Sequence, residues 1–180
     1  MKKHYILFSI ILLIISCRPG NTEQLVTVEN RYSISLPSFL IKAGNSLNED
    51  ASLQYQNIWK EFYVIVIDEL QSDVREALID NELTDTYSDD LKGYSELLLY
   101  NFGQSIKISH KSDIVDTLIN NMPAKVLTIK GETEGLNIFY SLAFIQGKER
   151  YYQVMTWTSA KQENTYKDKM NKILYSFKEL

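Results

Sequence analysis

The stretch FYVIVID, residues 62–68, decides the fold class of this chain. Its apolar residues follow one another without alternation, so both faces of an extended backbone are apolar, and its Val and Ile residues favour strands. A strand of this kind must be covered on both sides. We therefore predict a central strand over residues 61–69, paired as a hairpin with residues 51–57.

The segments that flank this hairpin alternate between strand and helix spacing. Before it, YSISL at residues 32–36 alternates polar and apolar side chains and is closed by Pro37, which predicts a strand. After it, residues 72–81 and about 87–102 have the spacing of helices. The second helix has an apolar stripe made of Leu91, Tyr94, Leu97, Leu98 and Phe102.

A run of strands and one more helix complete the predicted order. The strands are expected over residues 114–119, 124–131, 137–146 and 150–158, with turns near 132–135 and at 147–148. Ser159 and Gln162 fit a capping box for the last helix. Its buried stripe would consist of Tyr166, Met170, Ile173, Leu174 and Phe177. This order predicts an α+β fold, an antiparallel sheet with helices packed on it, as a single domain over residues 25–180.

The N-terminal residues have the pattern of a secretory signal peptide. MKKH is followed by an uncharged apolar run over residues 5–15, and Arg18-Pro19-Gly20 would stop a helix soon after it. The run is shorter than the roughly 20 residues that a spanning helix needs. We therefore predict a signal peptide over residues 1–16.

Ile14-Ile15-Ser16-Cys17 resembles the lipobox of bacterial lipoproteins. The resemblance implies that the chain is cut before Cys17 and that this cysteine is lipidated on sulfur and acylated on its new amine. Residues 17–24 would then be a lipidated cysteine and a short tether to a cell envelope membrane. The residues after Cys17 lack an acidic run, which favours the periplasmic face. The alternative is a buried cysteine in an uncleaved anchor.

Composition excludes several classes of function for residues 17–180. They hold 17 basic and 23 acidic side chains and no cysteine besides Cys17, so no disulfide framework can form. Residues 17–102 carry a net charge of −9 and residues 103–180 a net charge of +3. No basic stripe interleaved with aromatic residues is present, so we expect no nucleic-acid partner.

Four stretches resemble the PsbP-like superfamily. They are YSISLP (32–37), the hairpin that ends in VIVIDE, NMPAKVLTIKG (121–131) and ILYSFK (173–178). The resemblance implies an α/β/α sandwich built on an antiparallel sheet. Its members include a photosystem extrinsic subunit, a Ran-binding import factor, envelope lipoproteins and secretion-system chaperones. Most of these are binding or accessory proteins, and no functional residue of the family maps onto a position here.

Motifs for the common kinds of catalytic centre are missing from the sequence. His110 lies in SHKSD (109–113), and neighbouring residues on one loop cannot assemble a catalytic triad, so a surface position is expected for it. Clustered His or Cys ligands and glycine-rich phosphate loops are absent. We expect no metal, no cofactor and no enzymatic activity.

An acidic segment is the first candidate site. Residues 68–90 contain nine acidic side chains against Arg75 alone. A calcium site would use Asp80, Glu82, Asp85, Asp89 and Asp90, but the EF-hand spacing is absent. The same carboxylates could form a glycosidase pair or a solvated helix face. The surface for a partner or cation would consist of Asp73, Asp80, Asp85, Asp89 and Asp90.

Aromatic residues on neighbouring strands are the second candidate. A groove for an apolar ligand or a partner helix would be formed by Tyr140, Tyr151, Tyr152 and Trp157. Core packing beneath helices is the alternative for these residues. The sequence thus favours a non-enzymatic, lipid-anchored envelope protein that binds another envelope protein. The alternatives are a lipoprotein for a small apolar ligand and a carboxylate-based hydrolase.

Overall fold

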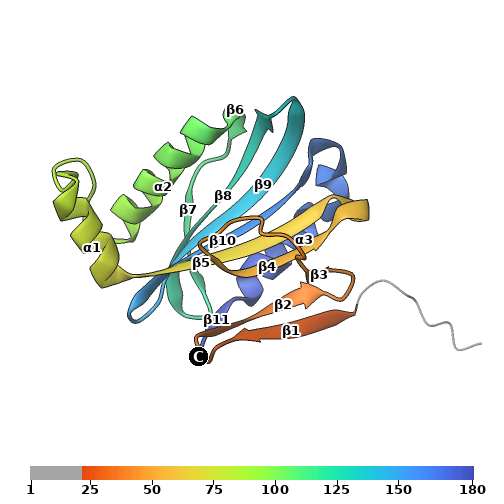
Figure 1. Cartoon of the computed structure of the whole chain (residues 1–180), viewed down its shortest axis with the longest axis horizontal. Helices are drawn as coiled ribbons and strands as arrows, with labels where there is room; N and C mark the ends of the chain where they lie inside the picture. Colours follow the sequence, from red (N-terminus) through yellow and green to blue (C-terminus); the bar gives the residue numbers. More distant parts are fainter. Residues whose placement is uncertain (1–21) are drawn as a thin grey trace, which may run out of the picture.

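The computed structural model describes residues 22–180, which form two antiparallel sheets and three α-helices (Figure 1). The large sheet has the strand order β3-β4-β5-β10-β9-β8-β6, with β7 also paired to β8, and the small sheet has the order β1-β2-β11. The strands are β1 (Glu23–Val28), β2 (Tyr32–Pro37), β3 (Ile41–Lys42), β4 (Ala51–Asn57), β5 (Phe62–Leu70), β6 (Lys107–Lys111), β7 (Val115–Ile119), β8 (Met122–Thr133), β9 (Leu136–Gln146), β10 (Arg150–Ser159) and β11 (Lys178–Glu179). The helices are α1 (Gln71–Asp80), α2 (Leu91–Ser105) and α3 (Glu163–Ser176), with the short 3-10 helices η1 (Ile58–Lys60) and η2 (Ala160–Gln162).

Tight turns connect the long strands of the large sheet. Glu134 and Gly135 join β8 to β9, and both have positive φ angles of 51° and 79°. Asn120 and Asn121 join β7 to β8 with φ angles of 48° and 69°. Two-residue turns with this conformation match the twist of antiparallel strands, which explains the Gly and Asn residues found there.

The central strand predicted from FYVIVID is confirmed as β5, between β4 and β10. Phe62, Val64 and Val66 point to one side of the large sheet and join its larger core cluster. Ile65 and Ile67 point to the other side. We name the side that contains Phe62, Val64 and Val66 the closed face, and the side that contains Ile65 and Ile67 the open face.

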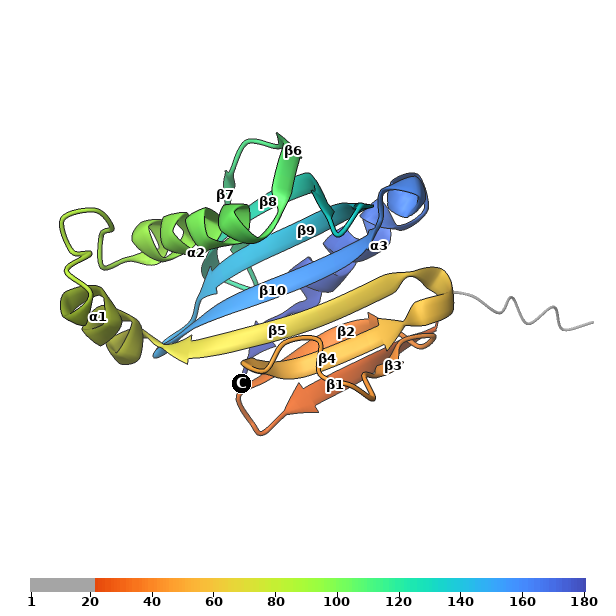
Figure 2. The same cartoon turned by 45° about the horizontal axis from the view of Figure 1, so that its top comes forward.

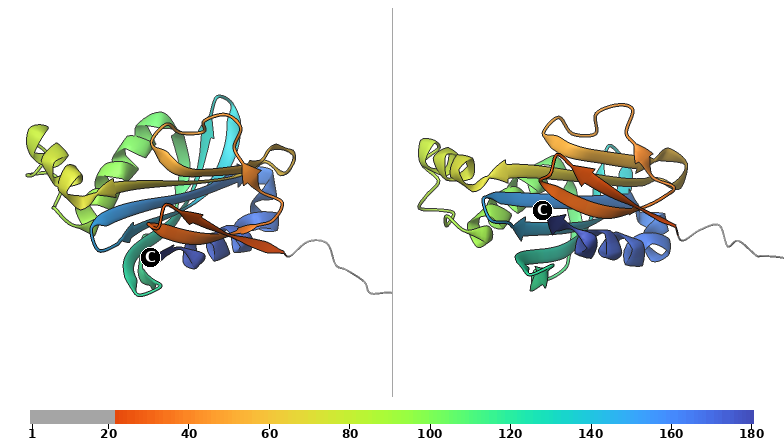
Figure 3. Two further views of the ribbon diagram at one scale, coloured as in Figure 1. Left: turned by 60° about the horizontal axis from the view of Figure 1, so that its bottom comes forward. Right: turned by 90° about the horizontal axis from the view of Figure 1, so that it is seen from below.

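The closed face is covered by α3 and the small sheet (Figure 3). Three buried rings meet where β2, β10 and the end of α3 converge: the Tyr32 ring lies 5.0 Å from that of Phe177, and Phe177 lies 4.7 Å from Tyr152. The predicted stripe on the last helix is confirmed. The buried residues of this cluster on α3 and just after it are Tyr166, Met170, Ile173, Leu174 and Phe177.

The open face is covered by α2, the start of α1 and the loop of residues 43–50 (Figure 2). Tyr94 and Leu91 of α2 are buried against the sheet. Leu98 and Phe102, which the sequence placed on the same stripe, are only half-buried. Helix α2 therefore covers β8 and β9 well, and the area over β5 and β10 less completely.

Some element boundaries differ from those expected. Helix α2 begins at Leu91 rather than near residue 87, because Asp90 is its N-cap and accepts a hydrogen bond from the Gly93 N–H. Strand β10 continues to Ser159 and η2 follows, so the predicted capping box at Ser159 and Gln162 is absent. Strand β6 was not predicted.

The start of the domain also differs from the expected one. Strand β1 begins at Glu23, which pairs with Pro37, so Glu23 and Gln24 belong to the small sheet rather than to a tether. The predicted signal peptide, the residues that resemble a lipobox and Cys17 lie outside the described residues. Within residues 22–180, no helix is both long and apolar enough to cross a membrane.

Candidate functional site

A cleft of about 430 Å³ lies on the open face, where loop 43–50, β5, α1, α2 and β10 meet. Its walls are apolar in part, through Ile67 and Leu98, and its rim is acidic. The lining residues are Asp50, Ile67, Asp68, Glu69, Leu70, Asp73, Leu98, Arg150 and Gln153. Four carboxylates and one guanidinium thus surround a space large enough for several side chains of a ligand.

Asp50 reaches the rim because Gln54 of β4 holds loop 43–50 in place. The Gln54 side-chain oxygen accepts hydrogen bonds from the backbone N–H of Leu47 at 2.5 Å and of Asn48 at 3.1 Å. Its amide nitrogen donates to the Asn48 carbonyl at 2.9 Å. These bonds keep Leu47 packed on the open face and set Asp50 just before the start of β4.

Glu69 is positioned by Tyr94 of α2. The Tyr94 hydroxyl donates a 2.7 Å hydrogen bond to the Glu69 carboxylate, and its ring stacks on Tyr151 with centroids 4.4 Å apart. Burial, followed by the Glu69 charge, raises the pKa of Tyr94 well above its ordinary value. The hydroxyl therefore keeps its proton and remains a donor, which fixes Glu69 at the junction of β5 and α2.

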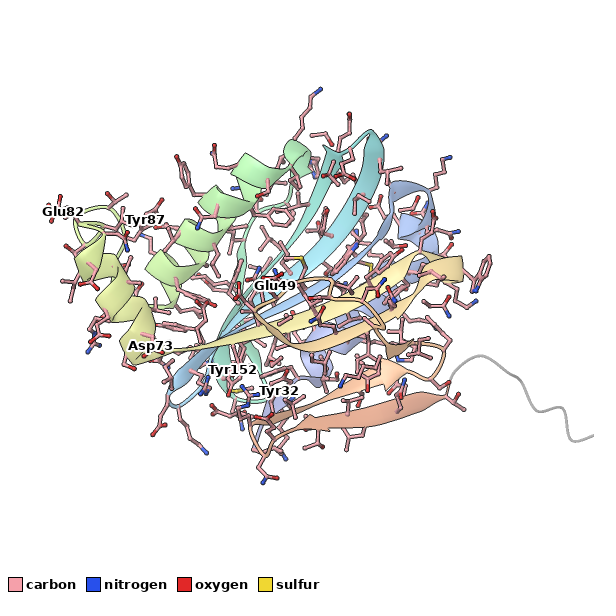
Figure 4. The ribbon with its side chains drawn as sticks, viewed as in Figure 1. Tyr32, Glu49, Asp73, Glu82, Tyr87 and Tyr152 are labelled. Carbon is pink, nitrogen blue, oxygen red and sulfur yellow. The ribbon has the colours of Figure 1, made fainter. Side chains whose placement is uncertain are left out.

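Asp73 lies in the first turn of α1, where a carboxylate is favoured by the helix dipole. The start of this helix is tied to the turn between β9 and β10. The Gln71 backbone N–H donates to the Glu149 carbonyl at 2.9 Å, and its side chain donates to the Gly147 carbonyl at 3.0 Å. The foot of α1 is thus fixed to the sheet, and Figure 4 shows Asp73 at this end of the helix.

The one guanidinium of the cleft is already engaged with a carboxylate. Asp68 has a side chain only 1% exposed and accepts hydrogen bonds from Arg31 at 2.6 Å and from Arg150 at 2.8 Å. This network lies toward the closed face, since Asp68 follows Val64 and Val66 in the alternation of β5. The charges left facing the cleft are those of Asp50, Glu69 and Asp73.

This arrangement suits a ligand that carries positive charge on an apolar stem. Lys and Arg side chains have this character, with methylene groups that can pack on Ile67 and Leu98 while the charged group meets the rim. Within residues 22–180, no group of three or more His, Cys, Asp or Glu side chains is placed to hold a metal ion.

The five carboxylates predicted as one partner surface have different environments. Asp73 lines the cleft. Asp89 forms a 2.5 Å ion pair with Arg75. Asp90 caps α2 by accepting from the Gly93 N–H at 2.9 Å and from the Ser88 hydroxyl at 2.7 Å. Asp80 and Asp85 are exposed, and Figure 4 shows the loop between α1 and α2, with Glu82 and Tyr87, projecting from the sheet.

The four aromatic residues predicted as one groove do not share a face. Tyr152 is 1% exposed in the closed-face cluster, and its hydroxyl donates to Glu179 at 3.0 Å. Tyr140 and Tyr151 are buried beneath α2 on the open face. Trp157 is half-buried on the open face and stacks on Tyr63 with centroids 5.2 Å apart. Adjacent residues of a strand point to opposite sides, so Tyr151 and Tyr152 could not line one groove.

His110 lies on the exposed edge strand β6. The neighbouring Ser109 hydroxyl donates to the Lys130 carbonyl at 3.2 Å, and Ser112 donates to the Asp113 carbonyl at 3.0 Å. Both serines are thus bonded to the backbone rather than to an imidazole. The structure gives no catalytic geometry at this position.

The density of acidic residues in the sequence indicated Asp73 but none of the other residues of the cleft. Asp50 and Glu69 lie 23 and 4 residues away from Asp73, and Leu98 comes from another helix. Only the fold brings these segments together. A usable signal was the position of Glu69 two residues after Ile67, the last residue of the apolar run, which places it at the end of a central strand.

Comparison with known proteins shows the fold. No protein-family model matches the chain, and no curated protein matches its sequence. Among solved structures, cyanobacterial PsbP (CyanoP) from Synechocystis sp. PCC 6803 is 9% identical, with a TM-score of 0.53, 88% of this chain covered and 92% of that chain. LpqN from Mycobacterium tuberculosis, involved in cell envelope biogenesis, is 11% identical, with a TM-score of 0.54 and coverage of 88% and 90%. The chain therefore has the PsbP-like fold, an antiparallel sheet with helices packed on it, as predicted.

Proposed function

We propose that this protein is a non-enzymatic, lipid-anchored component of the bacterial cell envelope that binds a basic segment of another envelope protein in the acidic cleft. The observation that carries the proposal is the cleft itself. Asp50, Glu69 and Asp73 face a space of about 430 Å³ whose apolar walls include Ile67 and Leu98. Its one guanidinium is engaged with Asp68.

The envelope location rests on two independent supports. Residues 1–17 have the charge, apolar length and final Ile-Ile-Ser-Cys of a lipoprotein signal, which would leave Cys17 attached to a membrane. LpqN, which shares the fold, is involved in cell envelope biogenesis. The periplasmic face is proposed because no acidic run follows Cys17.

A peptide fits the cleft better than a small apolar ligand does. Pockets for apolar ligands are enclosed and lined mainly by apolar side chains. Here the rim is charged, and the aromatic residues Tyr140 and Tyr151 are occupied in packing under α2. A basic segment of a partner would meet three carboxylates at once, and such charge complementarity favours rapid and selective association.

The test uses paired substitutions in the full-length protein in its native membrane. Asp50→Asn with Asp73→Asn should weaken co-purification of crosslinked partners roughly tenfold, since each charged contact of this kind contributes about 0.2–1 kcal/mol or somewhat more when partly desolvated. The salt dependence of binding should flatten as well. Both residues are exposed, so the unfolding temperature should change little.

Asp80→Asn with Asp85→Asn is the matched control, because it removes the same charge from the neighbouring exposed segment. This control variant should retain the partners. If the control loses them and the cleft variant does not, the partner docks on the α1–α2 loop instead. If both variants retain every partner at low and high salt, the cleft is not the binding site.

A further inference from the structure

The tip of the hairpin between β4 and β5 exposes two large apolar side chains to solvent. Trp59 is 90% exposed and Ile58 is 58% exposed, and they lie side by side in η1 with Lys60. A tryptophan buries roughly 150–250 Å² when it is covered. An exposed apolar pair of this kind at a projecting tip is typical of a surface that meets another phase or molecule.

Hydrogen bonds order this tip. The Asn57 side chain accepts from the Lys60 backbone N–H at 3.0 Å and donates to the Phe39 carbonyl at 2.8 Å. The Lys60 ammonium lies 5.3 Å from the centre of the Phe39 ring. Trp59 is thus held outward by a defined turn, so that covering it costs little conformational entropy.

The start of the described chain lies beside the same tip. The Ser38 backbone N–H donates to the Thr22 carbonyl at 2.9 Å, and Ser38 precedes Phe39, to which Asn57 and Lys60 are bound. Figure 2 shows the start of β1 and the turn between β4 and β5 at the same end of the molecule. Cys17 and Thr22 are five residue steps apart, a distance of at most about 18 Å along an extended chain.

We infer that Ile58 and Trp59 enter the headgroup layer of the bilayer that holds the lipids of Cys17, as a second membrane contact. This inference rests on the lipid anchor of the proposed function. The indole ring of tryptophan favours the boundary between apolar chains and water, and Lys60 can meet lipid phosphates. Glu61, which is exposed next to the tip, limits the depth to the headgroup layer.

This contact fixes the orientation of the domain. Strand β5 runs from Phe62, next to the tip, to Leu70 at the foot of α1, which is nine residues or roughly 30 Å. Helix α1 and the turn between β4 and β5 therefore lie at opposite ends of β5 (Figure 1). With the tip in the membrane, the acidic cleft faces away from the bilayer, and a partner can reach it.

The test measures tryptophan fluorescence of the full-length protein in phospholipid vesicles. The chain has two tryptophans, so Trp157→Phe leaves Trp59 as the only emitter. Vesicles of phosphatidylethanolamine and phosphatidylglycerol are prepared with and without bromine on the acyl chains near the headgroup. Trp59 should lose most of its emission in the brominated vesicles and resist quenching by acrylamide in water.

The matched control moves the tryptophan to the other end of the molecule. Trp59→Phe, Trp157→Phe and Ile79→Trp together place the only emitter on α1, at a site that is 57% exposed in the native chain. This emitter should be unaffected by bromine and fully quenched by acrylamide. The unsubstituted chain is a second measurement, in which bromine should remove only the part of the emission that Trp59 contributes.

The experiment distinguishes a missing membrane contact at Trp59 from a missing lipid on Cys17. The mass of the N-terminal peptide shows whether Cys17 carries lipid. A lipidated protein in which Trp59 behaves like the control emitter overturns the inference and leaves the proposed function standing, with a protein partner as the occupant of the tip. Bromine quenching of Trp59 in a protein without lipid supports the tip contact and overturns the anchor.

Discussion

The two faces of the large sheet differ in how completely they are covered. Twenty buried residues form the closed-face cluster, with six half-buried neighbours. The open-face cluster has eleven buried residues and nine half-buried neighbours, among them Ile67, Leu98 and Phe102. The closed face thus has the close packing of a core that holds the fold, whereas the open face combines packing with accessible surface.

The two sides of the large sheet therefore differ in character: the closed face holds the fold together, and the open face leaves surface accessible. The closed face ends in an ionic network in which Arg31 and Arg150, both partly exposed, share the nearly buried carboxylate of Asp68. The open face ends in the acidic cleft, where α2 and loop 43–50 leave a gap over β5 and β10. A fold can accept substitutions on a half-covered face at a modest cost in stability, which makes this face the suitable place for a binding site.

The largest expected effect comes from removing a ring on the closed face. Phe177→Ala deletes a side chain that is 0% exposed and packed between Tyr32 and Tyr152, so the free energy of unfolding should fall by about 3–5 kcal/mol. Phe102→Ala, which removes a half-buried ring 5.0 Å from Tyr140 on the open face, should cost about 2 kcal/mol. Urea unfolding of both variants measures the difference, and equal losses would contradict the contrast between the faces.

A smaller loss of stability is expected when the ion pairs of Asp68 with Arg31 and Arg150 are removed. Asp68→Asn keeps the shape of the side chain but leaves Arg31 and Arg150 without their shared carboxylate. The free energy of unfolding should fall by about 2–3 kcal/mol, less than for a fully buried pair because both arginines are partly exposed. Glu29→Asn, which removes the exposed partner of Arg31, is the control and should cost under about 1 kcal/mol. Unfolding curves that show similar losses for the two variants would mean that burial of Asp68 adds nothing.

The smallest effect should arise where α2 begins to cover the open face. Asp90→Ala removes the cap of this helix and should cost about 1 kcal/mol, whereas Asp90→Asn retains an acceptor and should cost less. The hydrogen bonds from Ser88 and Gly93 hold the pKa of Asp90 below its ordinary value. The charged cap therefore stabilises fully above the ordinary carboxyl pKa, and this contribution is lost as the pH falls through the lower, folded-state pKa. The difference in the free energy of unfolding between the wild type and Asp90→Ala should become smaller in acid. A difference that does not change with pH would mean that the charge of Asp90 does not contribute to the cap.

The strands with apolar patterns could be predicted from the sequence, and those without could not. FYVIVID predicted β5 and its two covered faces, because its composition leaves no polar side. Strand β6, with all five residues exposed, has no apolar alternation that could reveal it. The small sheet was missed because β11 has only two residues and its partner β2 lies far away in the sequence.

The candidate site was predicted only in part, for a related reason. Asp73 could be identified from the density of acidic residues, but its neighbours Asp50 and Leu98 meet it only after the chain folds. Asp89 and Asp90 looked equivalent to Asp73 in the sequence. In the structure, Asp89 forms an ion pair with Arg75, and Asp90 caps α2. The aromatic groove was wrong because it grouped Tyr151 with Tyr152, and neighbouring positions on a strand cannot share a face.

The small sheet joins the first and last strands of the described chain, β1 and β11, through β2. Strand β11 pairs with β2, and the Ser176 hydroxyl bonds to Ser35, which is 141 residues earlier in the chain. A contact this distant in sequence must wait until residues 176–179 have been synthesised and are free to move, and such topologies fold slowly. Until those residues are available, the closed face lacks the cover that α3 and β11 provide, so this core is completed only when the last residues of the chain have docked.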